Sequence, residues 1–413
     1  MSVHYHEYRH LMNSVRINAT LKVTLIGILI IGLFPLFLDI NGNPIFSYLG
    51  LFFNLFLAFS YICMSIIAFQ KRMTLVLPKE TVVAQIVDMI ADGLENLNII
   101  SCLLVIAFRQ KCLVKFYEKL KAIDLRLYDI NVKNCKTFDI NMNIISLGRK
   151  LTIVGISFFI ICTVDHLRLL FDNYILSIRF WIAYQSTKIV IYNLIIVFCE
   201  TMIFFRKSFA KLNLLFQQSS LSYDKIQGTV QKKCSYVKYT NIISKDDFVS
   251  LDIGHLHNIL SELVDDFVGF YSFMIGSTIV HNFIHLSSNI YRIYLFLKFN
   301  GDWSLLDFLD FTSIMIWLNV KILILYFLCA LPAAVSEEAN KKSIFIHSML
   351  KAVRENDLTS NNKRITRLLT ILCQTNLEIS VYGVFNLDFK CFQSILTTST
   401  MCIVFMIQLE HLK

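Results

Sequence analysis

Residues 309–332 read LDFTSIMIWLNVKILILYFLCALP, and this stretch decides the fold class. Its 24 residues contain only two charged side chains, Asp310 and Lys321. About 20 apolar residues in a helix are enough to cross the hydrocarbon core of a bilayer. The stretch therefore predicts a transmembrane helix.

Six further stretches have the same character, which predicts seven membrane spans. An eighth apolar stretch, 22–38, is shorter and is interrupted by two glycines and Pro35. It is predicted to be an interfacial or re-entrant helix, with a full span as the alternative. The seven predicted spans are 45–69, 82–108, 151–171, 186–205, 267–297, 309–332 and 388–409.

The composition of the whole chain agrees with this fold class. Of 413 residues, 55% are hydrophobic and 17% are charged, whereas soluble domains carry about 25% charged residues. These values exclude a disordered protein, a disulfide scaffold and a typical soluble enzyme. The apolar runs are continuous and lack the alternation of barrel strands. We therefore expect an all-α integral membrane protein that is not an enzyme, needs no cofactor and binds no nucleic acid.

The distribution of basic residues predicts the orientation of the chain. The loops 109–150, 206–266 and 333–386 together contain 25 Lys and Arg residues, whereas the three alternate loops contain five. Cytoplasmic loops carry such an excess of Lys and Arg. The long loops and the N-terminus are therefore predicted to face the cytosol, and the C-terminus to face outward.

Three segments in these loops show the spacing of amphipathic helices. We expect these helices to extend the spans into the cytosol and to form a bundle there, although lying flat on the lipid headgroups is the alternative. The polar segment 219–250 lacks such a pattern and is predicted to be flexible. The three apolar faces are Leu113, Phe116, Leu120, Ile123, Leu127 and Ile130; Leu256, Ile259, Leu260, Leu263, Val264 and Phe267; and Ile365, Leu368, Leu369, Leu372 and Ile379.

Polar side chains inside the spans mark a candidate ligand pocket. Inserting a charged side chain at the centre of a membrane helix costs about 2.5–3.5 kcal/mol, so such residues face protein or water. Most lie in the predicted outer half of the membrane. An ion-pair network that only stabilises the bundle, for instance Asp92 with Lys321, is the alternative. The predicted pocket residues are Asp88, Asp92, His166, Tyr192, His281, His285, Asn289, Trp317 and Asn319.

Two of these residues have the spacing of metal ligands. His281 and His285 are four residues apart, which places them on one helix face. No cysteine or carboxylate in the same span completes a tetrahedral site, so no metal site is predicted. Asp88, Asp92 and Glu95 likewise share one face of the second span.

The last predicted span differs from the others in its polar first half. One stripe at helical spacing carries hydroxyl groups and ends in apolar residues and an amide, which suits a pore wall with a constriction. A single helix cannot enclose a pore, so this function needs a symmetric ring of subunits. A packing helix with small residues at its contacts is an equally good interpretation. The stripe consists of Ser394, Thr398, Met401, Phe405 and Gln408.

The end of this span resembles the signature TYhhhhhQF of insect gustatory receptors, where h is an apolar residue. The five apolar positions are 403–407, and Gln408 matches the glutamine. Leu409 replaces the phenylalanine, Met401 the threonine and Cys402 the tyrosine. Further stretches that resemble the family are 383–388, with its glycine, aromatic residue and aspartate, 328–340, and 32–36.

The resemblance implies a ligand-gated, non-selective cation channel of four subunits in the plasma membrane of sensory neurons. Four copies of the last helix would line the pore, with Phe405, Gln408 and Leu409 as the gate. The partners implied are a small-molecule tastant, membrane lipids, permeating cations and either identical or related subunits. Receptors for sugars have Glu where this chain has Ile403, so a bitter or other small molecule is favoured.

The resemblance also implies a division of the chain. Residues 1–44 would form a cytosolic N-terminus with the interfacial helix, and 45–332 a six-helix ligand-binding region with cytosolic extensions. Residues 333–387 would form a cytosolic anchor segment, and 388–413 the pore helix with a short extracellular tail.

Three other classes share parts of this pattern. A divergent insect odorant receptor has the same expected topology. A G-protein-coupled receptor needs the opposite orientation, against the count of basic residues. A transporter is expected to show paired halves with broken helices, and this sequence shows no internal repeat.

Overall fold

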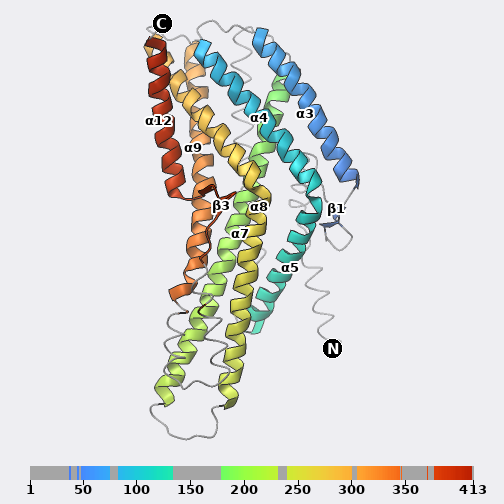
Figure 1. The fold of residues 1–413 in the computed structure, drawn as a ribbon, viewed down its shortest axis with the longest axis vertical. Helices are drawn as coiled ribbons and strands as arrows, with labels where there is room; N and C mark the ends of the chain where they lie inside the picture. Colours follow the sequence, from blue (N-terminus) through green and yellow to red (C-terminus); the bar gives the residue numbers. More distant parts are fainter. Residues whose placement is uncertain are drawn as a thin grey trace.

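The fold is described from a computed structural model, shown in Figure 1. The structure describes residues 37–38, 44–45, 48–74, 82–133, 178–230, 240–299, 305–344, 346, 370 and 376–411. Predictions for the third span, 151–171, fall outside these residues. The same is true of the 22–38 segment except for its last two residues.

Long helices build the upper part of the molecule as it is drawn in Figure 1. Five described helices contain segments that are long and apolar enough to cross a membrane, which confirms the all-α membrane fold. The predicted fourth span, 186–205, lies inside a sixth helix. The helices are α3 (Tyr48–Thr74), α4 (Val82–Phe108), α7 (Ile178–Val230), α8 (Thr240–Phe299), α9 (Leu305–Asn340) and α12 (Phe389–His411).

The ends of several helices differ from those predicted from the sequence. A two-stranded antiparallel sheet pairs β1 (Phe37–Leu38) with β2 (Pro44–Ile45), so the first predicted helix begins three residues later than expected. Pro332 lies inside α9 instead of ending it, and the helix continues to Asn340. The helices α7 and α8 also extend into the segment 219–250, as far as Val230 and from Thr240.

The lower part of the molecule consists of the extensions of α7 and α8, with α5 (Gln110–Lys133) beside them. The predicted helical faces on α5 and α8 are confirmed: Leu113, Ile123, Leu256 and Leu260 are buried in the main hydrophobic core. Both α5 and α7 contact α8, as a bundle requires. Most of the third predicted face lies outside the described residues, and Ile379 is not helical.

Aromatic rings connect these extensions to the membrane region. Phe267 of α8 lies at their centre, with ring centroids 5.2 Å from Phe116, 5.7 Å from Phe198 and 5.8 Å from Phe205. One turn further along α8, the ring of Tyr271 lies 4.6 Å from that of Phe267. The cluster joins α5, α7 and α8 at one level, so it fixes how these three helices pack.

A short hairpin positions the last helix. β3 (Ser380–Val381) pairs with β4 (Phe385–Asn386), and the turn between them holds Tyr382 and Gly383 at positive φ angles of 51° and 68°. Two consecutive positive φ values favour glycine in the turn.

The hairpin ends at the start of α12 (Figure 1). Asp388 caps that helix, because its Oδ1 accepts a hydrogen bond of 2.8 Å from the backbone N–H of Cys391. At the other side of the hairpin, the amide of Asn340 forms two hydrogen bonds with the backbone of Leu377, which ties the end of α9 to this segment.

Candidate functional site

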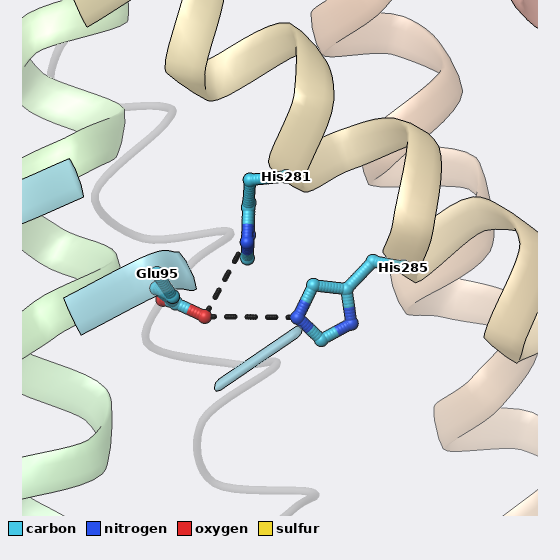
Figure 2. A group of neighbouring side chains, drawn as sticks. All are labelled: Glu95, His281 and His285. Atoms are coloured by element: carbon cyan, nitrogen blue, oxygen red, sulfur yellow. Dashed lines mark ion pairs between the residues drawn. The ribbon is translucent and has the colours of Figure 1, made fainter. Parts of the chain in front are cut away.

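Three polar side chains from α4 and α8 meet inside the membrane region (Figure 2). Glu95 of α4 directs Oε2 toward α8, where it lies 3.7 Å from Nε2 of His281 and 3.8 Å from Nε2 of His285. Glu95 is 3% exposed and His281 is 1% exposed. The i, i+4 spacing puts both imidazoles on one face of α8, with ring centroids 4.5 Å apart and planes at 73°.

Two lysines and two aromatic rings adjoin this group. Nζ of Lys321 on α9 lies 3.1 Å from Nε2 of His281. Nζ of Lys188 on α7 lies 3.9 Å above the ring of Trp317, which is a close cation–π contact. The Trp317 ring stacks with that of Tyr192, at a centroid distance of 6.4 Å. Four helices therefore contribute to one buried site that carries charges of both signs.

A hydrogen-bonded amide beside the site fixes the position of α4 against α8. Nδ2 of Asn98 donates a hydrogen bond of 3.0 Å to Oγ1 of Thr278, and Oγ of Ser277 donates one of 2.6 Å to Oδ1 of Asn98. Asn98 lies one turn beyond Glu95, and Thr278 lies one turn before His281. Satisfied polar groups of this kind hold buried helices in one arrangement.

The structure brings together part of the predicted pocket. Tyr192, His281, His285 and Trp317 belong to the cluster, and Asn289 is buried one turn beyond His285 on α8. Asn319 is exposed, and its amide donates to the carbonyl of Met315 in its own helix.

The remaining pocket predictions are not described at the level of side chains. Asp88 and Asp92 lie on α4, but their side chains fall outside the described part, as does all of His166. Three charged residues join the cluster that were not among the predicted pocket residues: Glu95, Lys188 and Lys321. Two features of the sequence could have identified these residues. Glu95 belongs to the carboxylate face of the second span, and both lysines lie within predicted membrane spans.

The last helix has one packed side and one exposed side. Packing is against α8 and α9, and it buries Ser399, Ile403 and Met406. The described side chains of the predicted pore stripe are all exposed in the single subunit, and Phe405 is 59% exposed. Leu409 is helical, but its side chain lies outside the described set. The exposed stripe comprises Ser394, Thr398, Met401, Phe405 and Gln408.

An open groove of about 610 Å³ lies between α8, the β3–β4 hairpin and the first half of α12. Ile279 and Phe283 of α8 form one wall, and Ser394 and Thr398 of α12 form another. The groove is separate from the buried cluster, because its lining does not include Glu95 or the two histidines.

Together, these features define a polytopic helical membrane protein with an internal polar site and an exposed final helix. The profile of the family described as "7tm Chemosensory receptor" matches residues 21–411. The chain belongs to this family. No curated protein matches the chain.

Solved structures show the same fold. The structure of the insect olfactory receptor OR5 from Machilis hrabei matches with a TM-score of 0.60 at 14% identity, covering 94% of this chain and 97% of that receptor. The structure of the same receptor in complex with eugenol matches with a TM-score of 0.58 at 12% identity over the same shares. The chain therefore has the fold of this olfactory receptor.

Proposed function

We propose that the protein is a taste-type chemosensory receptor that works as a ligand-gated, non-selective cation channel. Four subunits, identical or related, would surround a central pore in the plasma membrane of sensory neurons. The proposal rests on the exposed stripe of α12. Ser394 and Thr398 carry hydroxyl groups in its first half, and the apolar side chains of Met401 and Phe405 follow them. Hydroxyl groups favour water and ions, and an apolar constriction closes a pore by dewetting.

The proposed division of the chain follows from this function. Residues 45–332 would bind the ligand, 388–413 would line the pore and end outside the cell, and 333–387 would anchor the subunits in the cytosol together with the helical extensions. Residues 1–44 would form the cytosolic N-terminus. The seven-span topology with an internal N-terminus is part of the same proposal and rests on the excess of basic residues in the long loops.

We assign ligand binding to the buried cluster around Tyr192, Trp317 and the two histidines. Aromatic walls with a few convergent polar groups are typical of small-molecule sites. A bitter or other small molecule is favoured over a sugar by the family resemblance, because Ile403 of α12 stands where the receptors for sugars carry Glu. Asp88, Asp92, His166 and Asn289 are assigned to the same site by their predicted positions.

Gating would follow from differential binding. A ligand shifts an equilibrium only by its difference in affinity between the closed and open arrangements. The cluster joins α4, α7, α8 and α9, and α12 packs on α8 and α9. A change in the packing of these helices around a ligand would therefore move α12 and widen the pore at Phe405, Gln408 and Leu409.

Shortening the side chains of Phe405 and Gln408 tests whether they form the gate. Phe405→Ala or Gln408→Ala should raise the ligand-independent current about tenfold, because a loss of about 1.4 kcal/mol from the closed state changes the open population by that factor. Currents are recorded from cells that express only this chain. Phe56→Ala on α3 is the matched control, since Phe56 is exposed to the same extent, 58%. Unchanged basal current and unchanged ion selectivity in both gate variants would refute the assignment.

An odorant receptor of the same architecture is the second candidate, favoured by the similarity to the fold of an olfactory receptor. A panel of involatile tastants and volatile compounds, applied to cells expressing the chain, separates the two. Activation only by volatile compounds would replace the taste assignment and leave the channel proposal in place.

A further inference from the structure

We propose that Glu95, His281 and His285 form a binding site for a divalent transition-metal ion such as Zn²⁺. The three residues converge from two helices, and their ligating atoms all lie within 4.8 Å of one another (Figure 2). Two imidazoles and a carboxylate are a recurring protein ligand set for zinc, which leaves a fourth position for water or another donor. Binding of the ion does not depend on the proposed channel function.

The distances are close to those of a formed site. Zinc bonds of about 2.0–2.1 Å in a tetrahedron place neighbouring ligand atoms roughly 3.3 Å apart. Oε2 of Glu95 already lies 3.7 Å from Nε2 of His281 and 3.8 Å from Nε2 of His285. All three ligating atoms lie within 4.8 Å of one another, so they must move closer together to coordinate one ion. The hydrogen bonds of Asn98 hold α4 and α8 at this separation, so little reorganisation of the backbone is required.

Burial distinguishes the group from a surface cluster. The side chains of Glu95 and His281 are almost fully enclosed, and that of His285 is 14% exposed while its Nε2 is buried. A metal ion there would join α4 to α8 within the helices assigned to ligand binding. The bridge would restrict the rearrangement of these helices that gating needs.

Lys321 competes for the same site. Its ammonium group lies 3.1 Å from Nε2 of His281 and donates to the nitrogen that the metal would use. The ion must displace this contact, and Lys188 adds a second nearby positive charge. Both effects weaken binding relative to a structural zinc site. Removing the charge of Lys321 should therefore raise the metal affinity by about tenfold or more.

Cobalt provides a direct test on the purified full-length protein. Titration with Co²⁺ should produce the intense visible absorption of four-coordinate Co²⁺, and Zn²⁺ should abolish it by replacement. His281→Gln, His285→Gln and Glu95→Gln should each weaken the absorption at least tenfold. His255→Ala is the matched control, because His255 is an exposed histidine on the same helix, and it should leave the titration unchanged.

Two gain-of-signal variants keep the test decisive if a loss-of-function variant does not fold. His285→Cys should add a thiolate-to-cobalt charge-transfer band, and Lys321→Gln should shift the titration to lower Co²⁺ concentration. A spectrum that is the same in wild-type and all folded variants, or binding that is unaffected by Lys321→Gln, would overturn the proposal. These measurements need no current, so a failed metal site and a failed channel assignment remain distinguishable.

Discussion

Glu95→Gln should lower the free energy of unfolding by about 3–5 kcal/mol, the usual cost of removing one member of a buried charged group. The carboxylate faces both histidines, and His281 also contacts the ammonium group of Lys321. Replacing the carboxylate of Glu95 by an amide leaves Lys321 and Lys188 buried with less compensating negative charge. Equilibrium unfolding in mixed micelles measures the loss.

A double-mutant cycle identifies the cause. The double variant Glu95→Gln/Lys321→Gln should be less destabilised than the sum of the two single variants, because the second change removes a charge that the first one left uncompensated. Glu118→Gln on the exposed surface of α5 is the control and should leave stability unchanged. Additive effects of the two single changes would show that these charges act independently.

Phe267→Ala should lower the free energy of unfolding by about 3–5 kcal/mol, since truncating a buried phenylalanine loses its contacts and leaves a cavity. Phe267 is 4% exposed and contacts rings from α5 and α7 as well as Tyr271 of its own helix. The same unfolding experiment measures this change.

Phe273→Ala provides the comparison within α8. Phe273 is 41% exposed on the membrane-spanning part of the helix, so its truncation removes few protein contacts. Equal losses in the two variants would show that the aromatic cluster is not the junction between the membrane region and the extensions.

Continuous hydrophobicity made the helices predictable from sequence. The span 82–108 coincides with α4, and 388–409 differs from α12 by one residue at its start and two at its end. The three-and-four spacing from Leu113 onward predicted α5, because a buried face leaves that pattern. Boundaries at Pro332 and in the segment 219–250 were not predictable, since tertiary packing and helix extension override local turn signals and polar composition.

The site was predictable only as a set of polar residues. The i, i+4 spacing fixed that His281 and His285 share a face, but no property of the sequence fixes how α4 is rotated against α8. That rotation selects Glu95 as the carboxylate beside the histidines. Asn319 was predicted to line the pocket, but it does not. It lies two residues from both Trp317 and Lys321 along the helix, and this spacing places it on the other, exposed side of α9.

The most direct test of the central proposal is an experimental structure of the assembled protein in a lipid bilayer mimic. We expect a four-fold ring in which the α12 stripe, including Thr398 and Phe405, faces the symmetry axis around a continuous pore. Ser399 and Met406 should face α8 and α9 within each subunit. An assembly in which Phe405 contacts lipid, away from any axis, would contradict the channel assignment.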